Sequence, residues 1–168
     1  MCRHFLEDYG LDVKVARYHN IYGPNGTYDG GREKAPAALC RKIIYALIEK
    51  NEVIDVWGDG KQTRSFLYID DCVEATLKFF DSKEHGPINI GSEEKVSINE
   101  MINKIEIISK KKFKRNYQLD KPKGVRGRNS DNTLIRKKLN WEPKYNLMRG
   151  LEHTYNWIQS EIKKKHNQ

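Results

Sequence analysis

The chain has 168 residues, of which 38% are hydrophobic and 32% charged, and its formal net charge is +8. That length can bury the core of one globular domain, and no apolar run approaches the roughly 18 residues that indicate a membrane span. The first residues, MCRHFLEDYG, carry acids and lack the apolar stretch of a signal peptide, which predicts a cytoplasmic protein. The three cysteines are widely spaced and form no CxxC motif or Cys/His cluster, which argues against a disulfide framework and a zinc site.

Helical and extended patterns alternate from the start of the chain. Apolar side chains in CRHFLEDY recur at helical spacing and predict a helix that Gly10 stops, with no capping residue in front of it. VKVARYH predicts a strand, and the glycine-rich segment IYGPNGTYDGGREK predicts turns. Ala35 and Pro36 then open a helix that extends to about Lys50, because proline is tolerated in a first helical turn.

The same alternation continues to the end of the chain. We expect strands in IDVWG, SFLYID, PINIG and FKRNYQL, and helices over about 71–80, 97–109 and 132–139. Ser97 and Glu100 offer a capping box for the second of these helices. A break around Pro143 is followed by a last amphipathic helix. This order predicts an α/β protein with some parallel strand pairing.

The positive charge is concentrated in one stretch. Between Lys104 and Arg128 ten basic residues stand against two acids, and the rest of the chain is balanced at 21 against 21. A phosphate-bearing partner, either nucleic acid or a nucleotide diphosphate, would suit such a patch. The lysines of 110–114 also fit a plain solvated surface. In KPKGVRGRNSDN, by contrast, basic residues alternate with glycines in a predicted loop and can converge on an anion.

Three blocks, in order, carry a family resemblance. ARYHNIYGPNGTYDGGREKAPAALCRK contains an RxxNxYGP motif, WGDGKQTRSFLYIDDCVEA contains GDGxQxRxFxYxxD, and PINIGS contains NIG. Together they resemble the C-terminal half of the extended short-chain dehydrogenase/reductases, the NAD-dependent epimerases and dehydratases of nucleotide sugars. GGREKAPAA and GVRGRNSDN are most similar to the branch of this family that epimerises GDP-mannose at C3 and C5. The similarity runs to about Lys163 without a large insertion.

The resemblance implies the last strands of a parallel Rossmann sheet joined to a small α/β substrate-binding lobe. Residues 1–34 would form the tail of the sheet region and an active-site loop. Residues 35–168 would form the substrate lobe, with one or two segments that return to the sheet. The resemblance also implies NAD as cofactor, GDP-mannose as substrate and a homodimer for the full-length enzyme, although a homodimer of this piece alone is not expected.

The implied reaction oxidises the sugar at C4 with NAD, which acidifies the neighbouring C3 and C5 protons so that an acid/base pair can exchange them. Lys34 matches the catalytic lysine of the family. It precedes the helix that Ala35 opens, so the positive end of the helix dipole would disfavour its charged form, as suits a proton-transfer group. Without the flanking motif, Lys34 would be interpreted as a surface lysine in a polar loop.

Further substrate contacts follow from the same motifs. Asn20 matches an asparagine that contacts the nucleotide sugar, although it could simply cap a turn. Glu33 and Ala35 flank Lys34 in the family's substrate contact. Lys42 lies two turns along the helix and could reach the same cleft, or could be an exposed helix lysine.

The diphosphate of the substrate is expected to meet a separate set of residues. Gln62, Thr63 and Arg64 match the segment that grips it, Arg128 matches a second arginine with that role, and Arg126 is a weaker candidate. Because a guanidinium can meet two phosphate oxygens at once, two arginines from different loops would clamp one diphosphate. The structural alternative for Arg64 is a buried ion pair with Asp70 or Asp71.

Other conspicuous residues have simpler interpretations. Trp57, Trp141 and Trp157 suit packing in a core or between lobes. His19 lies in the strand that approaches the cofactor in this family, but a lone histidine at a strand end is usually a hydrogen-bonded structural residue. Cys40 and Cys72 fall in predicted helices as small buried groups.

The sequence departs from the family pattern in what it lacks. It has no GxxGxxG turn for the NAD pyrophosphate and no YxxxK pair for the redox step, so we expect no turnover by this chain alone. Three hypotheses follow. The chain is part of an epimerase that works with an N-terminal Rossmann half, or a non-catalytic nucleotide-sugar binding module, or a nucleic-acid binder that uses the basic stretch. Within the enzyme hypothesis, a 4-epimerase or 4,6-dehydratase would share most of the motifs.

Overall fold

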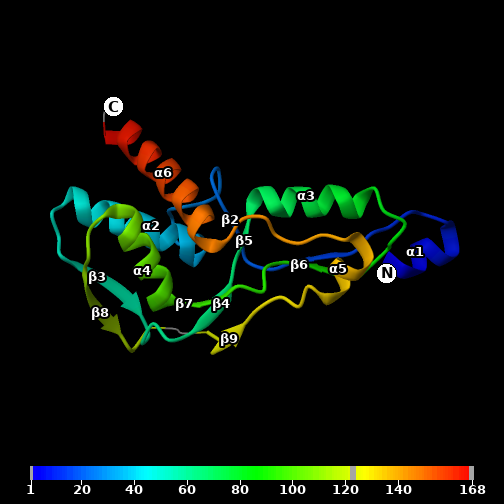
Figure 1. Ribbon diagram of the computed structural model, residues 1–168, viewed down its shortest axis with the longest axis horizontal. Helices are drawn as coiled ribbons and strands as arrows, with labels where there is room; N and C mark the ends of the chain where they lie inside the picture. Colours follow the sequence, from blue (N-terminus) through cyan, green and yellow to red (C-terminus); the bar gives the residue numbers. More distant parts are fainter. Residues whose placement is uncertain (1, 122–123, 167–168) are drawn as a thin grey trace.

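The computed structural model describes residues 2–121 and 124–166. Short strands pair in small, mostly parallel ladders, and helices pack around them (Figure 1). The chain order is α1 (Cys2–Tyr9), β1 (Ala16–Tyr18), β2 (Ile21–Tyr22), α2 (Ala35–Ile48), β3 (Val53–Trp57), β4 (Thr63–Ser65), β5 (Leu67–Tyr68), α3 (Ile69–Phe80), β6 (Ile88–Ile90), β7 (Lys95–Ser97), α4 (Ile98–Ser109), β8 (Lys114–Gln118), β9 (Gly127–Arg128), α5 (Thr133–Leu139) and α6 (Leu147–His166).

Strand pairing brings distant parts of the chain together. β1 pairs with β6, β2 with β5 and β3 with β8, all parallel. β4 lies at the centre of a three-stranded sheet, antiparallel to β7 and parallel to β9. The predicted α/β class with parallel pairing is therefore confirmed.

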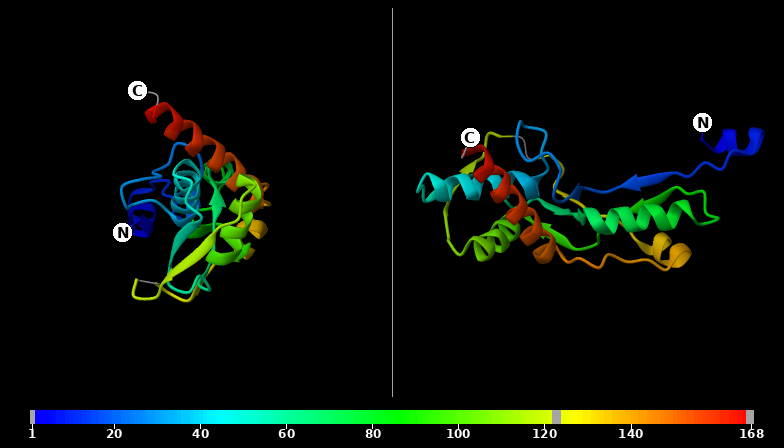
Figure 2. Two further views of the ribbon diagram at one scale, coloured as in Figure 1. Left: turned by 90° about the vertical axis from the view of Figure 1, so that its left-hand side faces the viewer. Right: turned by 90° about the horizontal axis from the view of Figure 1, so that it is seen from above.

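Two hydrophobic cores lie toward the two ends of an elongated molecule. The larger core joins α2, α4 and α6 to one face of β3, and its buried members include Ile43, Ile54, Ile105 and Ile158. The smaller core joins α3, β6 and α5 around Phe79, Ile88, Ile135 and Trp141. Figure 2 shows α1 projecting at the end opposite to α6, so the two ends of the described chain lie far apart.

The helix boundaries follow the sequence signals closely. α1 ends before Gly10, and α2 begins at Ala35 with proline in its first turn, as predicted. At α4 the predicted capping box is present. Ser97 Oγ accepts from the Glu100 amide at 3.1 Å, and the Glu100 carboxylate accepts from the Ser97 amide at 2.7 Å. This box fixes the first turn of α4, which in turn supports a loop of the candidate site.

Some expectations about the elements were wrong. The predicted strand SFLYID is divided, because β4 ends at Ser65, β5 covers only two residues and α3 already begins at Ile69. An acidic side chain in the first turn favours this early start, since it faces the positive end of the helix dipole. Trp141 is buried and Trp157 packs against the larger core, as expected, but Trp57 leaves 54% of its surface exposed. It sits on the outward face of β3, where alternate residues point to solvent.

Candidate functional site

A cavity of about 520 Å³ opens between the start of α2, β3 and β4. Most of the residues predicted to contact substrate line it, and they come from four separate segments of the chain: Asn20, Glu33, Lys34, Ala35, Lys42, Gln62 and Arg64. Thr63 and Arg128 are not part of this lining. The structure therefore assembles in one place residues that the sequence analysis selected from separate motifs.

Lys34 is the N-cap of α2. Its backbone is extended, with φ −76° and ψ 157°, and its side chain is exposed at the mouth of the cavity. Its carbonyl accepts the amide of Ala38 at 3.0 Å, so the backbone of Lys34 is fixed by the helix while the amine stays available. Ala35 follows as the first residue of the helix. The Lys34 amine therefore lies at the end of a flexible side chain whose backbone is fixed by α2.

Glu33, beside Lys34, is held far more tightly. Its side chain is only 7% exposed and forms an ion pair with Arg41 at 2.7 Å. Burial alone would raise the pKa of the Glu33 carboxyl, but hydrogen bonds from its own backbone and from Arg41 hold that pKa below its usual value. Its second oxygen, Oε2, is buried and has no hydrogen-bond partner among the described residues. The cavity wall therefore carries a charged acceptor with unused capacity.

Lys42 reaches the cavity, as the sequence suggested. Its Nζ donates to the carbonyl of Asp55 at 2.9 Å and lies 5.9 Å from the centre of the Trp57 ring. Burial lowers the pKa of Lys42, an effect that the nearby carboxylate of Asp55 opposes. The amine remains a donor that faces both the cavity and the exposed indole.

Gln62 occupies a loop that α4 supports. Its Nε2 donates to the carbonyl of Trp57 at 3.0 Å, and its Oε1 is buried without a hydrogen-bond partner in the described structure. The loop turns at Gly60, whose φ of +69° favours glycine, and a Cβ there would overlap the side chain of Asn99. Asn99 in turn donates to the Asp59 carbonyl at 3.2 Å. The start of α4 thereby fixes the loop that presents Gln62.

Arg64 and Arg128 come together through strand pairing. They are register partners in the parallel ladder of β4 and β9, and the Thr63 amide donates to the Arg126 carbonyl at 3.0 Å one step earlier. Arg64 Nη1 donates to the Thr63 carbonyl at 2.7 Å. Arg128 is exposed beside it. The two predicted phosphate contacts are thus adjacent, although only Arg64 lines the cavity itself.

The alternative role of Arg64 is not realised. The carboxylate of Asp71 is buried, but it accepts the backbone amides of Lys144 and Tyr145 at 3.0 and 2.9 Å instead of the guanidinium. It thereby ties α3 to the segment that leads into α6. Asp70 is exposed. An ion pair of Arg64 with Asp71, the buried one of the two, is therefore not formed.

Asn20 and His19 lie where β1 passes into β2. Asn20 has a left-handed backbone, φ 44°, and its Nδ2 donates to the Ser65 carbonyl at 3.0 Å, so the turn role proposed as its alternative is partly present. His19 is partly buried, and its amide donates to Ile90 at 3.0 Å. Burial and, next, the charge of Arg128 lower the pKa of His19, while a hydrogen bond with Asn89 opposes the shift. His19 is therefore near the second arginine.

The sequence analysis missed residues that line the same cavity. Arg41 and Asp55 were not singled out, and Trp57 was assigned to packing. The signal for Trp57 was available, because strict alternation in VIDVW places it on the face opposite to the buried Ile54 and Val56. No comparable signal marked Arg41, whose role depends on the path of the loop in front of α2.

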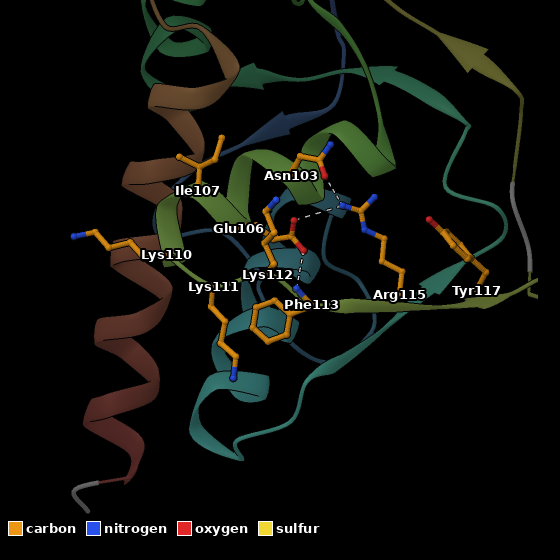
Figure 3. Close-up of a pocket in the computed structure, with 9 residues that line it drawn as sticks. All are labelled: Asn103, Glu106, Ile107, Lys110, Lys111, Lys112, Phe113, Arg115 and Tyr117. Atoms are coloured by element: carbon orange, nitrogen blue, oxygen red, sulfur yellow. Dashed lines mark hydrogen bonds and ion pairs between the residues drawn. The ribbon is translucent and has the colours of Figure 1, made fainter.

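A larger cavity, about 840 Å³, lies elsewhere, between α4 and β8. Figure 3 shows Lys110 and Lys111 pointing away from one another, while Arg115 turns inward to Glu106 and Asn103. The Glu106 carboxylate also accepts the Phe113 amide at 2.9 Å. The lysine-rich stretch is thus divided between solvent and a satisfied ion pair, and it gathers none of the predicted substrate contacts.

The helices α2, α3 and α4 do not present the glycine turn that usually holds the pyrophosphate of a dinucleotide. Such a group binds at a helix N-terminus that is reached through a glycine turn directly after a strand. α2 follows a long loop and not a strand, whereas α3 and α4 directly follow β5 and β7 without a glycine. Within the described part of the chain no group of metal-ligating side chains occurs, and no helix is long and apolar enough to cross a membrane.

Comparison with known proteins places this fold and site in a family. The model of the NAD dependent epimerase/dehydratase family matches residues 1–91, which is more than half of the chain. The chain belongs to this family.

The similar proteins with curated functions handle nucleotide sugars. GDP-mannose 3,5-epimerase of Arabidopsis thaliana is 48% identical over 165 residues, which cover 98% of this chain and 42% of that protein. GDP-mannose 3,5-epimerase 1 of Oryza sativa subsp. indica is 48% identical over 168 residues, covering 100% of this chain and 43% of the rice protein. The chain thus spans less than half the length of these relatives and corresponds to a C-terminal part of them.

Solved structures of nucleotide-sugar epimerases are also similar to this chain. UDP-glucose 4-epimerase of Thermotoga maritima, determined with UDP-glucose, has a TM-score of 0.85 and 28% identity over 95% of this chain and 50% of that one. UDP-glucuronic acid 4-epimerase of Bacillus cereus, determined with UDP-glucuronic acid and NAD, has a TM-score of 0.77 and 29% identity over 95% of this chain and 49% of that one. The fold is that of the C-terminal region of nucleotide-sugar epimerases.

Proposed function

We propose that this chain is the substrate-binding part of a nucleotide-sugar epimerase that converts GDP-mannose by proton exchange at C3 and C5. One observation carries the proposal. A single cavity gathers the cations Lys34, Lys42 and Arg64 with the buried acceptors of Glu33 and Gln62. A nucleotide sugar offers both an anionic diphosphate for the cations and hydroxyl donors for the acceptors. The 48% identity to plant GDP-mannose 3,5-epimerases supports GDP-mannose over UDP-linked sugars.

In this proposal Arg64 and Arg128 bind the diphosphate. Their register pairing on β4 and β9 starts both side chains from one side of the same sheet, where two planar forks can meet several phosphate oxygens. Gln62, in the loop that α4 holds, and Thr63, at the start of β4, complete the contact. Lys42 and Asn20, which line the same cavity, contact the remainder of the ligand.

Lys34 has the role of a proton-transfer group. Its exposed amine lies at the cavity mouth, on the rigid end of α2, and can take a proton from or return one to a carbon of a bound sugar. NAD, when bound to the complete enzyme, supplies the reversible oxidation at C4 that makes those protons acidic. Because α2, α3 and α4 lack the usual glycine turn after a strand, we assign NAD to an N-terminal Rossmann half and expect no turnover without it.

The surface around the smaller core supports the proposal that an N-terminal Rossmann half packs there. Among the described residues β1 and β6 pair only with each other, whereas parallel sheets normally have more strands and are covered on both faces. Val73, Leu77 and Phe80 form an exposed apolar stripe along α3. We therefore propose that residues 1–34 are the end of a Rossmann region and that residues 35–168 are the substrate lobe, which sends β6 back to β1. The complete protein is proposed to be a cytoplasmic enzyme, able to form a homodimer.

Two alternatives remain within the same site. A non-catalytic nucleotide-sugar module would keep the cavity seen in the described residues and would need no dinucleotide site. A 4-epimerase or 4,6-dehydratase would use the same diphosphate contacts, and the similarity to UDP-glucose 4-epimerase favours this class over a nucleic-acid binder.

Calorimetric titration of the chain with GDP-mannose, GDP and UDP-glucose tests the proposal. We expect GDP-mannose to bind more tightly than GDP, and UDP-glucose to bind less tightly than GDP-mannose. Co-expression with an N-terminal Rossmann half, followed by transfer of deuterium from D₂O to C3 and C5, then separates an epimerase from a binding module. Absence of heat with all three ligands at millimolar concentration would refute a nucleotide-sugar site.

A further inference from the structure

Arg41 on α2 reaches back to the loop that carries Lys34. Its Nε donates to the Tyr28 carbonyl at 2.9 Å, and its Nη2 donates to the Glu33 carboxylate at 2.7 Å. Its Nη1 lies 3.6 Å from the Asp29 carboxylate. The side chain is only 22% exposed. Three nitrogens of one guanidinium thus hold both ends of residues 28–33.

The same loop is held from its other side by α6. The Tyr28 ring packs edge-on against Trp157, with centroids 5.4 Å apart, and Lys165 Nζ lies 5.1 Å from its centre. Tyr28 is therefore fixed both by its carbonyl, through Arg41, and by its ring, through α6. Between these anchors and Lys34 stand Gly30 and Gly31, both with positive φ and with open space around their Cα atoms, so the loop supplies little rigidity of its own.

We propose that Arg41 is the positioning residue of this site, which fixes Lys34 through Glu33. The inference rests on the proposed function, because it concerns the geometry of the proposed proton-transfer group. Glu33 is buried and charged, so it needs a cation to remain in place, and Arg41 is the cation it contacts. Lys34 is the next residue. A Glu33 released from Arg41 would leave its buried position and free the backbone on the N-terminal side of Lys34, which the α2 hydrogen bond to the Lys34 carbonyl does not hold.

An arginine is required because of geometry as well as charge. The acceptors lie on Tyr28, Asp29 and Glu33, and a planar guanidinium can address all of them at once. A lysine at position 41 would keep the positive charge but present one nitrogen. Arg41→Lys should therefore bind GDP-mannose more weakly than the wild type and more tightly than Arg41→Gln. Glutamine keeps hydrogen-bonding capacity but loses the charge.

The first measurement compares two ligands on the full chain by calorimetry. Lys34 would contact the sugar, whereas Arg64 and Arg128 would contact the diphosphate. We expect Arg41→Gln to weaken GDP-mannose binding about tenfold or more and to change GDP binding less than about twofold. Arg149→Gln is the control, because it makes the same change of residue at an arginine that lies over the Tyr145 ring at 4.4 Å and does not line the cavity. Equal weakening of both ligands, or of neither, would overturn the positioning role.

The second measurement needs no ligand. Amide hydrogen exchange in the ligand-free chain should become faster in residues 29–34 of Arg41→Gln and Arg41→Lys, while residues 39–48 of α2 keep their wild-type protection. Unchanged exchange in 29–34 would show that Arg41 does not hold the loop. If the wild-type chain binds neither GDP nor GDP-mannose, the proposed function fails, and the exchange result still decides whether Arg41 positions the Lys34 loop.

Discussion

Arg64 on β4 and Arg128 on β9 stand opposite each other in a parallel ladder, joined one residue earlier by a bond from the Thr63 amide to the Arg126 carbonyl. Register partners face the same side of a sheet, and neighbouring strands lie about 4.8 Å apart. Like charges on neighbouring strands repel one another, and an anion bound by both removes that repulsion. The pair is therefore the place where we propose that the diphosphate binds.

Loss of either arginine should weaken every ligand that carries the diphosphate. Since hydrogen bonds to charged groups contribute about 1.5–3 kcal/mol, we expect Arg64→Ala and Arg128→Ala each to weaken GDP and GDP-mannose binding about 10- to 100-fold. Calorimetry at two salt concentrations measures both the loss and its electrostatic origin. Lys112→Ala, at an exposed lysine of the cavity between α4 and β8, is the control. Equal losses in Lys112→Ala would mean that general charge, and not the ladder, attracts the ligand.

Replacement of Lys34 should separate chemistry from binding. In a complete enzyme assembled with an N-terminal half, Lys34→Met should lower the exchange of sugar protons with solvent about 10²–10⁴-fold, the usual contribution of a general acid or base. GDP-mannose should bind about tenfold more weakly, as in Arg41→Gln, because the sugar contact is lost while the diphosphate contacts remain. Mass spectrometry of sugar recovered from D₂O gives the rate. Arg32→Gln, two residues earlier and also exposed, should exchange at the wild-type rate. Full exchange in Lys34→Met would assign the proton transfer to another group.

The titration of His19 should report on Arg128. The positive charge of Arg128 disfavours the imidazolium form and so helps to lower the pKa of His19, after burial. Removal of that charge in Arg128→Gln should raise the pKa of His19, and a bound GDP, which adds negative charge nearby, should raise it in the wild type. Imidazole NMR signals followed from pH 4.5 to 8 measure both effects. The other four histidines provide the internal control. A His19 pKa that stays constant in both experiments would separate Arg128 from this site.

Replacement of Gly60 by alanine should destabilise the chain more than the backbone angle of Gly60 alone would predict. Gly60 and Gly10 have nearly the same φ, +69° and +65°, but only Gly60 faces a side chain, that of Asn99, where a Cβ would stand. A left-handed alanine costs about 1–2 kcal/mol at either position. Gly60→Ala should lose more free energy of unfolding than Gly10→Ala, and should also weaken ligand binding through Gln62. Urea denaturation measures the difference. Equal losses in the two variants would show that the Asn99 side chain moves aside at no cost in free energy.

Local signals predicted much of the fold. Helical periodicity, the proline in the first turn of α2 and the Ser97–Glu100 box located the helices, because each depends on residues close in sequence. The short strands β2, β7 and β9 were missed, since each has two or three residues and exists only through a distant partner. The division of SFLYID into β4, β5 and the start of α3 was missed for the same reason.

The candidate site shows the same division between local and distant information. Family motifs, and for Lys42 its position along the helix, selected seven residues from four separate segments that the structure collects around one cavity. Arg41 could not be selected, because its importance arises from a loop that folds back onto α2. Trp57 could have been, since its alternation with Ile54 and Val56 already placed it on the solvent face.

The β4–β9 ladder joins two segments that are far apart in the chain, and its two residue pairs make it a weak contact by itself. A ligand that binds only when both strands are aligned stabilises that alignment by mass action, by about 2.7 kcal/mol when its concentration is a hundred times its dissociation constant. A diphosphate would then act as a reversible cross-link, so that the stiffness of this end of the molecule depends on how much nucleotide sugar surrounds it.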